Sequence, residues 1–228
     1  MIAPEALLEF AKNALGLPHD VNLKLVPLSG RGSDRAFFRL TWGSTHSAIL
    51  IRYDSKRTEN AYYGNIALFL RNLNVPAPTL LHHDSDQCIM LMEDLGNIDL
   101  WSFRGDPWEV RKELYKKTLD VIHKLHTFPI ENFPAARVKL MEPFGPDLYK
   151  WEREYFRDNF VSEVCKIKME PAFEQQFEVE LRCLAADIPA ASEALVHREF
   201  QSQNARRTKS DLGARYTKVY RFGWINRF

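Results

Sequence analysis

The spacing of hydrophobic residues first predicts a short helix and then strands. Residues 4–15 place four apolar side chains on one helical face, namely Leu7, Leu8, Ala11 and Leu15. The period then shortens to two, which predicts strands at 21–28, 36–42 and 47–53. They are separated by the turn LSGRGSD and by Gly43-Ser44. This order indicates an antiparallel meander whose first turn is rich in glycine.

A second helix and a buried strand follow the meander. Thr58 is placed to cap a helix that runs to about Leu73, and the sequence VPAP at 75–78 prevents its continuation. His82-His83 is interpreted as part of a polar loop. The run CIMLMED at 88–94 predicts a buried strand that leaves the sheet. A β-rich N-terminal lobe therefore ends near residue 94.

The pattern beyond Gly96 is helical. Asp106-Pro107-Trp108-Glu109 predicts a capping box, with Pro107 at the first helical position of a helix of about five turns. Further helices are predicted near 147–168 and 171–186. These patterns divide the chain into an N-terminal lobe at 1–94, a partial helical lobe at 95–204 and an aberrant basic tail at 205–228.

Composition and charge exclude several classes of protein. Apolar residues make up 45% of the chain and aromatic residues 12%, which is enough to bury a core. No apolar run approaches the length of a membrane span, and the first residues do not form a signal peptide, so we expect a cytoplasmic protein. The three cysteines are far apart and contain no CxxC, which argues against a disulfide framework or a zinc knuckle.

The basic residues gather at the C-terminal end. Residues 205–228 hold seven Lys or Arg against Asp211 alone, whereas the net charge of the whole chain is only +1. The whole chain is therefore not a nucleic-acid binder by charge. A nucleic-acid or lipid-binding arm is an alternative for the tail, although its aromatic residues make it less polar than most such arms.

Two segments contain residues suited to chemistry. Glycines in the turn Gly30-Arg31-Gly32-Ser33 allow the backbone to approach a phosphate, yet most glycine-containing turns between strands are only turns. The segment VHREFQSQN at 196–204 supplies the acid Glu199 and, five residues later, the amide Asn204. The two segments together are more informative than either one alone.

The order of these motifs resembles the aminoglycoside phosphotransferase and choline kinase family. The shared pieces are the glycine-rich hairpin, IMLMEDLG, a long helix ending in HKLH, and VHREFQSQN, over about residues 20–204. Within the family the chain is most similar to bacterial sugar kinases of the N-acetylmuramate kinase type. The resemblance implies an α+β, protein-kinase-like bilobal fold with a β-rich N-lobe and an incomplete α-helical C-lobe. It also implies phosphoryl transfer from ATP, with Mg²⁺, to a small-molecule hydroxyl of a sugar or amino-sugar. Neither nucleic acid nor a membrane is implied as a partner.

The resemblance assigns nucleotide contacts to the N-terminal lobe. Gly30, Arg31, Gly32 and Ser33 would cover the phosphates, and Met92 to Asp94 would form the hinge whose backbone meets the adenine. Alternation along the strand 47–53 puts Ala48, Leu50 and Arg52 on one face, and Arg52 is the candidate phosphate-pairing cation. Glu59 is its candidate partner. The alternatives are a solvated Arg52 and a Glu59 that acts only as a first-turn anion.

The resemblance assigns the chemistry to the second segment. Glu199 stands where the family has a catalytic Asp, the carboxylate that orients or deprotonates the acceptor hydroxyl. Asn204 matches the metal-binding amide, and His197 is expected to brace the loop. His123 and His126 are interpreted as helix-packing residues rather than metal ligands.

The chain also departs from the family pattern. Glu199 in place of Asp moves the carboxylate by about 1.5 Å, and a displacement of that size costs about 100-fold in rate. No clear metal-binding Asp follows Asn204, and we interpret Asp211-Leu212-Gly213 and Arg221-Phe222-Gly223 as chance matches. We therefore expect the resemblance to stop at Asn204, the tail to come from a shifted reading frame or a fused gene, and the truncated chain to have negligible kinase activity. The alternatives are a nucleotide-binding pseudokinase that binds a partner, and an inactive fragment that exposes apolar surface.

Overall fold

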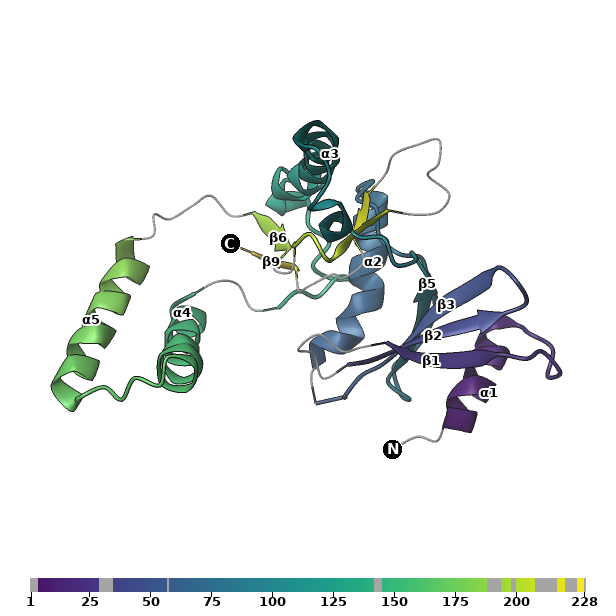
Figure 1. Ribbon diagram of the computed structural model, residues 1–228, viewed down its shortest axis with the longest axis horizontal. Helices are drawn as coiled ribbons and strands as arrows, with labels where there is room; N and C mark the ends of the chain where they lie inside the picture. Colours follow the sequence, from purple (N-terminus) through teal and green to yellow (C-terminus); the bar gives the residue numbers. More distant parts are fainter. Residues whose placement is uncertain are drawn as a thin grey trace.

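The computed structural model describes most of the chain, namely residues 4–28, 35–56, 58–141, 145–187, 194–197, 200–207, 217–219 and 225–227. Its first part contains α1 (Pro4–Leu15), β1 (Lys24–Leu28), β2 (Ala36–Trp42), β3 (His46–Arg52), the 3₁₀ turn η1 (Thr58–Tyr62), α2 (Tyr63–Asn72), β4 (Leu80–Asp84) and β5 (Ile89–Glu93). Its second part contains η2 (Leu100–Phe103), α3 (Trp108–His126), η3 (Ile130–Asn132), α4 (Pro146–Tyr155), the π-helix η4 (Phe156–Val164) and α5 (Pro171–Asp187). Four short strands follow, β6 (Leu195–His197), β7 (Ala205–Arg207), β8 (Thr217–Val219) and β9 (Ile225–Arg227). Figure 1 shows the sheet and α1 at one end of the molecule and α4 and α5 at the other.

A five-stranded antiparallel sheet forms the first part, in the order β1-β2-β3-β5-β4. The predicted meander is correct, and the strand 36–42 has the predicted bounds. Two predictions about the sheet are wrong. The run CIMLMED forms the predicted buried strand, β5, but this strand does not leave the sheet, because it pairs with both β3 and β4. His82 and His83 lie in β4 rather than in a polar loop, because an edge strand exposes side chains that a central strand would bury.

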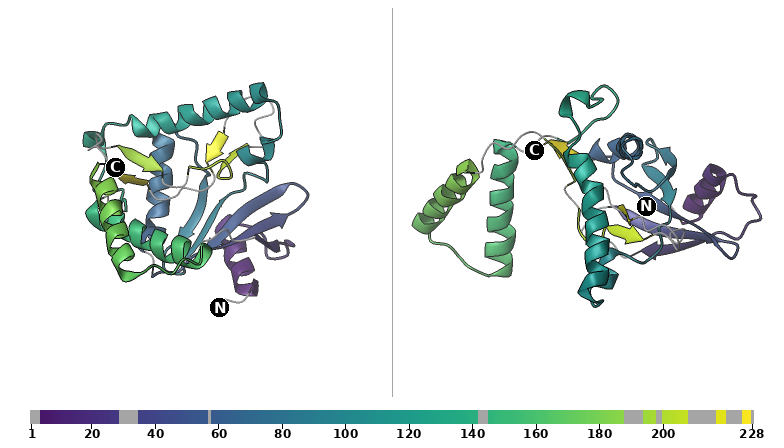
Figure 2. Two further views of the ribbon diagram at one scale, coloured as in Figure 1. Left: turned by 60° about the vertical axis from the view of Figure 1, so that its left-hand side comes forward. Right: turned by 90° about the horizontal axis from the view of Figure 1, so that it is seen from above.

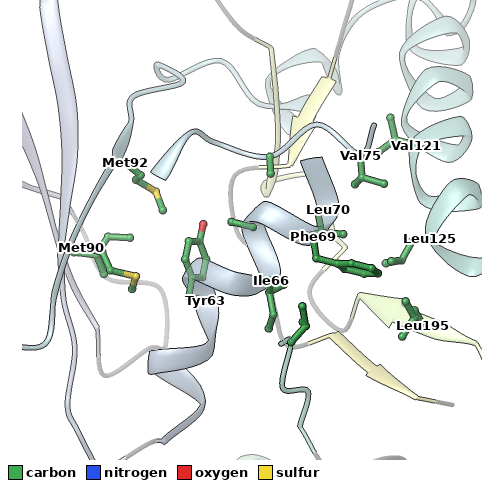
Figure 3. Close-up of a cluster of buried hydrophobic side chains, with 14 of the residues drawn as sticks. Tyr63, Ile66, Phe69, Leu70, Val75, Met90, Met92, Val121, Leu125 and Leu195 are labelled. Atoms are coloured by element: carbon green, nitrogen blue, oxygen red, sulfur yellow. The ribbon is translucent and has the colours of Figure 1, made fainter. Parts of the chain in front are cut away.

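The two faces of the sheet bury different clusters. The α1-face cluster packs side chains of β2, β3 and β5 against α1, and includes Leu7, Ala11, Leu40, Leu50 and Leu91. The α2-face cluster packs the other side of the same strands against α2, and includes Ile49, Ile51, Met90, Met92 and Leu70. Figure 3 shows that the α2-face cluster continues to Val121 and Leu125 of α3 and to Leu195 of β6. The α2 face of the sheet is therefore the one that joins the helical part.

The helix α3 begins without the predicted capping box. Trp108 is its first residue and Pro107 occupies the N-cap, where no side chain accepts a hydrogen bond from the first turn. Proline cannot cap in that way because it has no side-chain acceptor. A capping box does occur nearby, between Asp99 and Ser102 at the start of η2. The segment 94–99, here called the linker, therefore ends in a fixed turn.

The helices α4, η4 and α5 form a hairpin that stands apart from the rest of the described chain (Figures 1 and 2). Aromatic rings stack along it, with the rings of Phe156 5.4 Å from Phe160 and 6.2 Å from Phe177. Many of its large apolar side chains are exposed, among them Trp151, Tyr155, Phe160, Phe173 and Leu184. An open depression of about 370 Å³ is lined by η4, residues 166–169 and Glu174 of α5, and contains none of the predicted site residues. Within the described part of the chain, no helix is both long and apolar enough to cross a membrane.

Candidate active site

The short strands β6 and β7 bracket the predicted catalytic loop. His197 ends β6 and Asn204 immediately precedes β7, and both side chains are buried, with 7% and 5% of their surface exposed. The Phe200 N–H donates to the His197 carbonyl at 3.2 Å, and the two rings meet edge to face at 5.6 Å. The Asn204 N–H donates to the Gln201 carbonyl at 2.8 Å. The bracing role of His197 stays a prediction, and Glu199 lies outside the described residues.

The strand that follows Asn204 is attached to the linker. Arg206 forms an isolated antiparallel bridge with Asp99, and its guanidinium donates a hydrogen bond to the Gly96 carbonyl. The Asp99 carboxylate accepts from Ser102 N–H at 2.9 Å, which holds the far end of the linker. The loop that carries His197 and Asn204 is thus tied to the segment that joins the two parts of the molecule.

The linker is also tied to the sheet, through an ion pair between Arg39 and Asp94. Two nitrogens of the Arg39 guanidinium contact the Asp94 carboxylate. Nε lies 2.7 Å from Oδ2, and Nη2 donates a hydrogen bond to Oδ1 at 3.0 Å. The guanidinium also donates to the Asn97 side chain at 2.8 Å and to the Gly96 carbonyl at 3.4 Å. The hydrogen bond from Nη2 and the ionic contact of Nε together fix the position of the charged pair. The Gly96 carbonyl therefore receives one arginine from the sheet and one from β7.

The same contacts determine the ionisation of Asp94. Burial alone would raise the pKa of this carboxyl, but hydrogen bonds from the Gly96 N–H, the Arg39 guanidinium and the Ser47 hydroxyl outweigh burial and lower it. The carboxylate is therefore charged and fully engaged within the fold. Met92 is likewise committed to the α2-face cluster, with 1% of its surface exposed. Because both side chains are engaged within the fold, a nucleotide at this predicted hinge would contact backbone groups.

Arg52 lies on the α1 face of the sheet. It pairs with Ile89, which belongs to the α1-face cluster, and the predicted common face with Ala48 and Leu50 is correct. The opposite side of β3 carries Ile49 and Ile51, which pack toward α2. Arg52 therefore sits on the side of the sheet away from α2 and the helical part. Its role as a phosphate-pairing cation stays a prediction that this placement does not favour.

A different arginine, which the sequence patterns did not single out, reaches toward α2. Arg35 stands between the glycine-rich turn and β2, and its Nε donates to the Asn60 side chain at 2.7 Å. Asn60 lies in η1, directly before α2, and is completely buried. The only available signal in the sequence was position, because Arg35 follows the glycine-rich turn. The glycine-rich turn itself, Gly30 to Ser33, and the side chain of Glu59 lie outside the described residues, so their roles stay predictions.

The described residues do not form a complete magnesium site. Asn204 offers one amide oxygen, and no group of three or more His, Cys, Asp or Glu side chains is placed to hold a metal ion in the part of the chain that the structure describes. Magnesium prefers several oxygen ligands in an octahedral arrangement. Asp211, a further carboxylate in the sequence, is outside the described residues. The role of Asn204 as a metal ligand therefore stays a prediction.

Comparison with protein families decides the relationship. Residues 24–212 match APH, the phosphotransferase enzyme family. The chain belongs to this family. The expectation that the resemblance stops at Asn204 is wrong, because the family match continues to residue 212 and includes Asp211. No curated protein matches the sequence.

Solved structures show the same fold at low sequence identity. The streptomycin-ATP-APH(2")-IIa ternary complex is 14% identical with a TM-score of 0.63, and the match covers 100% of this chain and 73% of that one. The macrolide 2'-phosphotransferase MphH from Brachybacterium faecium is 18% identical with a TM-score of 0.58, covering 98% and 73%. Choline kinase LicA from Streptococcus pneumoniae is 11% identical with a TM-score of 0.60, covering 97% and 70%. The predicted α+β, protein-kinase-like fold is confirmed.

Proposed function

We propose that this phosphotransferase-family chain transfers the γ-phosphoryl group of ATP to a hydroxyl of a small molecule, a sugar or amino-sugar. The observation that carries the proposal is the loop between His197 and Asn204, buried at both ends and tied through Arg206 to the linker. Family membership and the ATP complex among the similar structures support ATP as the donor. The named acceptors of the similar structures, which include aminoglycosides and choline, support a small-molecule acceptor.

The proposed chemistry assigns one task to each segment. Backbone groups of the turn Gly30–Ser33 cover the phosphates, and backbone groups at Met92–Asp94 meet the adenine. The acceptor oxygen forms a bond to the γ-phosphorus while the bond to the β,γ-bridging oxygen breaks and ADP leaves. Glu199 receives the proton of the acceptor hydroxyl. The longer side chain of Glu199, compared with Asp, makes this step slower than in a family member with Asp.

A second function is suggested by the few metal ligands that the described residues supply. Among the described residues Asn204 supplies one oxygen, and no cluster of acidic or histidine side chains completes a site. A chain that binds ATP but holds magnesium weakly would act as a nucleotide-binding pseudokinase. The bound ATP would then stabilise the fold for the binding of a partner, and no phosphoryl group would be transferred.

Two measurements distinguish these functions. The first is thermal unfolding with and without Mg-ATP, because a ligand at about 100 times its dissociation constant adds about 2.7 kcal/mol of stability. The second is transfer of labelled γ-phosphate from ATP to a panel of amino-sugars, N-acetylated sugars, aminoglycosides and choline. Stabilisation with transfer to a sugar supports the enzyme, and stabilisation without transfer supports the pseudokinase. The absence of both would reject ATP binding altogether.

Two variants test the assigned residues in the same assays. Gly32→Val should weaken ATP binding, since a branched side chain obstructs the approach of the backbone to phosphate. Glu199→Gln should abolish transfer while leaving ATP binding unchanged, because an amide cannot accept the proton. If the Gly32→Val protein binds ATP as well as the parent, the turn is not part of the nucleotide site.

A further inference from the structure

The linker joins both parts of the molecule at one atom, the carbonyl oxygen of Gly96. Arg39 of β2 donates a hydrogen bond to this oxygen from the sheet at 3.4 Å. Arg206 of β7 donates to the same oxygen from the strand that follows Asn204. A carbonyl oxygen has two lone pairs and accommodates both donors. Movement of the sheet or of β7 relative to the linker therefore stretches a hydrogen bond at Gly96.

Arg39 also controls the other polar group of the Gly96 backbone. The Gly96 N–H donates to the Asp94 carboxylate at 2.9 Å, and the Arg39 guanidinium holds this carboxylate at 2.7 and 3.0 Å. The φ angle of Gly96 is +79°, a conformation that favours glycine. The direction of the Gly96 carbonyl is therefore set by this tight turn and by its link to the sheet.

Arg206 fixes the other end of the linker. Its backbone forms an antiparallel bridge with Asp99, the residue that caps η2. On its own strand Arg206 follows Asn204 and Ala205, which are only 5% and 2% exposed. Closely packed residues of this kind transmit a displacement rather than absorb it. The attachment of Arg206 to the linker therefore sets where the end of the loop 197–204 lies.

Through these contacts the linker connects the two groups that the proposed reaction must align. Asp94 belongs to the predicted hinge for the adenine, and the loop 197–204 ends at the predicted metal ligand. Hydrogen bonds at Gly96 run from Asp94 on one side to Arg206 on the other. A displacement of about 1 Å between reacting groups costs about 100-fold in rate. Small shifts at Gly96 are therefore sufficient to slow the reaction.

We propose that Arg206 is a positioning residue for phosphoryl transfer, which acts on the loop 197–204 through the Gly96 carbonyl, with Arg39 as its counterpart on the sheet. The inference rests on the proposed function, because it concerns the transfer step at that site. Arg206 does not belong to the hinge that meets the adenine. Its loss should therefore slow transfer and leave the affinity for ATP unchanged.

The first test separates turnover from binding. Arg206→Met, which keeps an apolar stem but has no donor, should lower kcat about 10- to 100-fold. The dissociation constant of ATP, measured by calorimetric titration, should stay within about twofold of the parent, which also shows that the variant is folded. Arg206→Lys should recover part of kcat, because an ammonium still donates to a carbonyl. The matched control is Arg104→Met, an exposed arginine that donates to the Trp101 carbonyl, and it should turn over like the parent.

The second test needs no activity, because it measures whether a change on the sheet loosens β7. Arg39→Lys keeps a charge beside Asp94 but cannot reproduce all the hydrogen bonds of the guanidinium. Amide hydrogen exchange at residues 205–207, followed by NMR, should become about fivefold faster, the effect of losing one hydrogen bond. The matched control is Tyr53→Phe, which removes a hydrogen bond to His83 at the β4 edge of the same sheet and should leave this exchange unchanged.

Three results would overturn the inference. They are a kcat of Arg206→Met equal to that of the parent, an ATP affinity that falls as much as kcat does, and exchange at 205–207 that is unchanged in Arg39→Lys. A parent chain that binds ATP and transfers no phosphoryl group would reject the proposed enzyme, and the exchange measurement then decides alone. Faster exchange in Arg39→Lys than in Tyr53→Phe would support the coupling through Gly96, and equal exchange in both would reject it.

Discussion

The helix α2 and the hairpin of α4, η4 and α5 are both rich in apolar residues, yet they are packed very differently. In α2 the side chains of Tyr63, Ile66, Phe69 and Leu70 are buried in the α2-face cluster (Figure 3). In the hairpin Val161 is the buried side chain among the described residues of α4 and η4, whereas Leu184 of α5 is 63% exposed. Hydrophobic spacing therefore predicts a helix in both places, and only packing distinguishes their contributions to stability.

The physical reason is that an apolar side chain stabilises a fold by leaving water. Burial of a leucine contributes about 1.5–3 kcal/mol, whereas a leucine that stays exposed contributes almost nothing. Aromatic rings that stack on the surface, as Phe156 and Phe160 do, recover only part of that energy. The N-terminal sheet with α2 should accordingly carry most of the stability of the described chain.

The largest effect is expected from creating a cavity in α2. Leu70→Ala should lower the free energy of unfolding by about 3–5 kcal/mol, because Leu70 is fully buried. The matched change in the hairpin, Leu184→Ala, should alter it by less than about 0.5 kcal/mol. Urea denaturation of both variants measures the difference. Equal losses would show that the hairpin is packed as tightly as α2.

The second-largest loss of stability is expected from breaking a buried ion pair. Asp94→Asn should cost about 2–3 kcal/mol, because it leaves the Arg39 guanidinium without its buried carboxylate. The exposed pair Lys150–Glu154 in α4 offers the contrast, and Lys150→Met should cost less than about 0.5 kcal/mol. Chemical denaturation at neutral pH and low salt is the measurement. A loss for Lys150→Met as large as that for Asp94→Asn would contradict the comparison.

The pair of Arg39 and Asp94 should also make the stability of the fold depend on pH. The pKa of Asp94 is lowered in the fold from an ordinary value of 3.8, so its contribution to stability is complete above that value. It is lost as the pH falls through the lower pKa of the folded state. The deficit of Asp94→Asn should therefore be largest near neutral pH and shrink below pH 3.8. A deficit that does not depend on pH would indicate that the carboxylate is not held by charge.

The smallest effect is expected at the edge of the sheet, where the Tyr53 hydroxyl lies 2.7 Å from Nε2 of His83. Burial raises the pKa of Tyr53 to about 12, helped by Cys88 and Asp84, so the hydroxyl is neutral. Tyr53→Phe should cost about 1 kcal/mol, the usual contribution of one hydrogen bond. Thermal unfolding at pH 8 measures this loss.

His83 adds a pH dependence to that edge. Burial lowers the pKa of His83 from its ordinary 6.5, which outweighs the opposing effect of Asp84. The unfolded chain then binds a proton more readily than the fold, so stability should be constant above pH 6.5 and decline as the pH falls below it. His83→Gln should remove this part of the decline, and His19→Gln, at an exposed position, should leave it unchanged.

Local patterns predicted most of the elements and missed features that depend on distant partners. The bounds of α1 and the common face of Ala48, Leu50 and Arg52 follow from periodicity alone. The strand β4 was missed because its His82-His83 pair is polar and lies at an edge. The capping box at 106–109 was wrong because Trp108, rather than Pro107, starts the helix.

In the candidate site, too, short motifs were predicted from the sequence and contacts between distant residues were missed. The motifs around residues 30–33 and 196–204 were found from sequence, and the family they indicated is confirmed by the match over 24–212. The three arginines that organise the described site were missed. Their partners lie 25 residues away for Arg35, 55 for Arg39 and 110 for Arg206. A pattern read over one or two turns contains no information about contacts at such separations.

The sequence by itself determined the order of helices and strands, the family and the two loops with candidate chemistry, because those depend on periodicity and on short motifs. Only the tertiary structure decided which face of β3 meets the helical part, because both faces of a central strand are apolar and the packing of α1 and α2 distinguishes them. This packing places Arg52 on the α1 face, and the side chain of Arg35 extends toward α2. It also joined Asp94, Gly96 and Arg206, because ion pairs and hydrogen bonds depend on distance in space rather than along the chain.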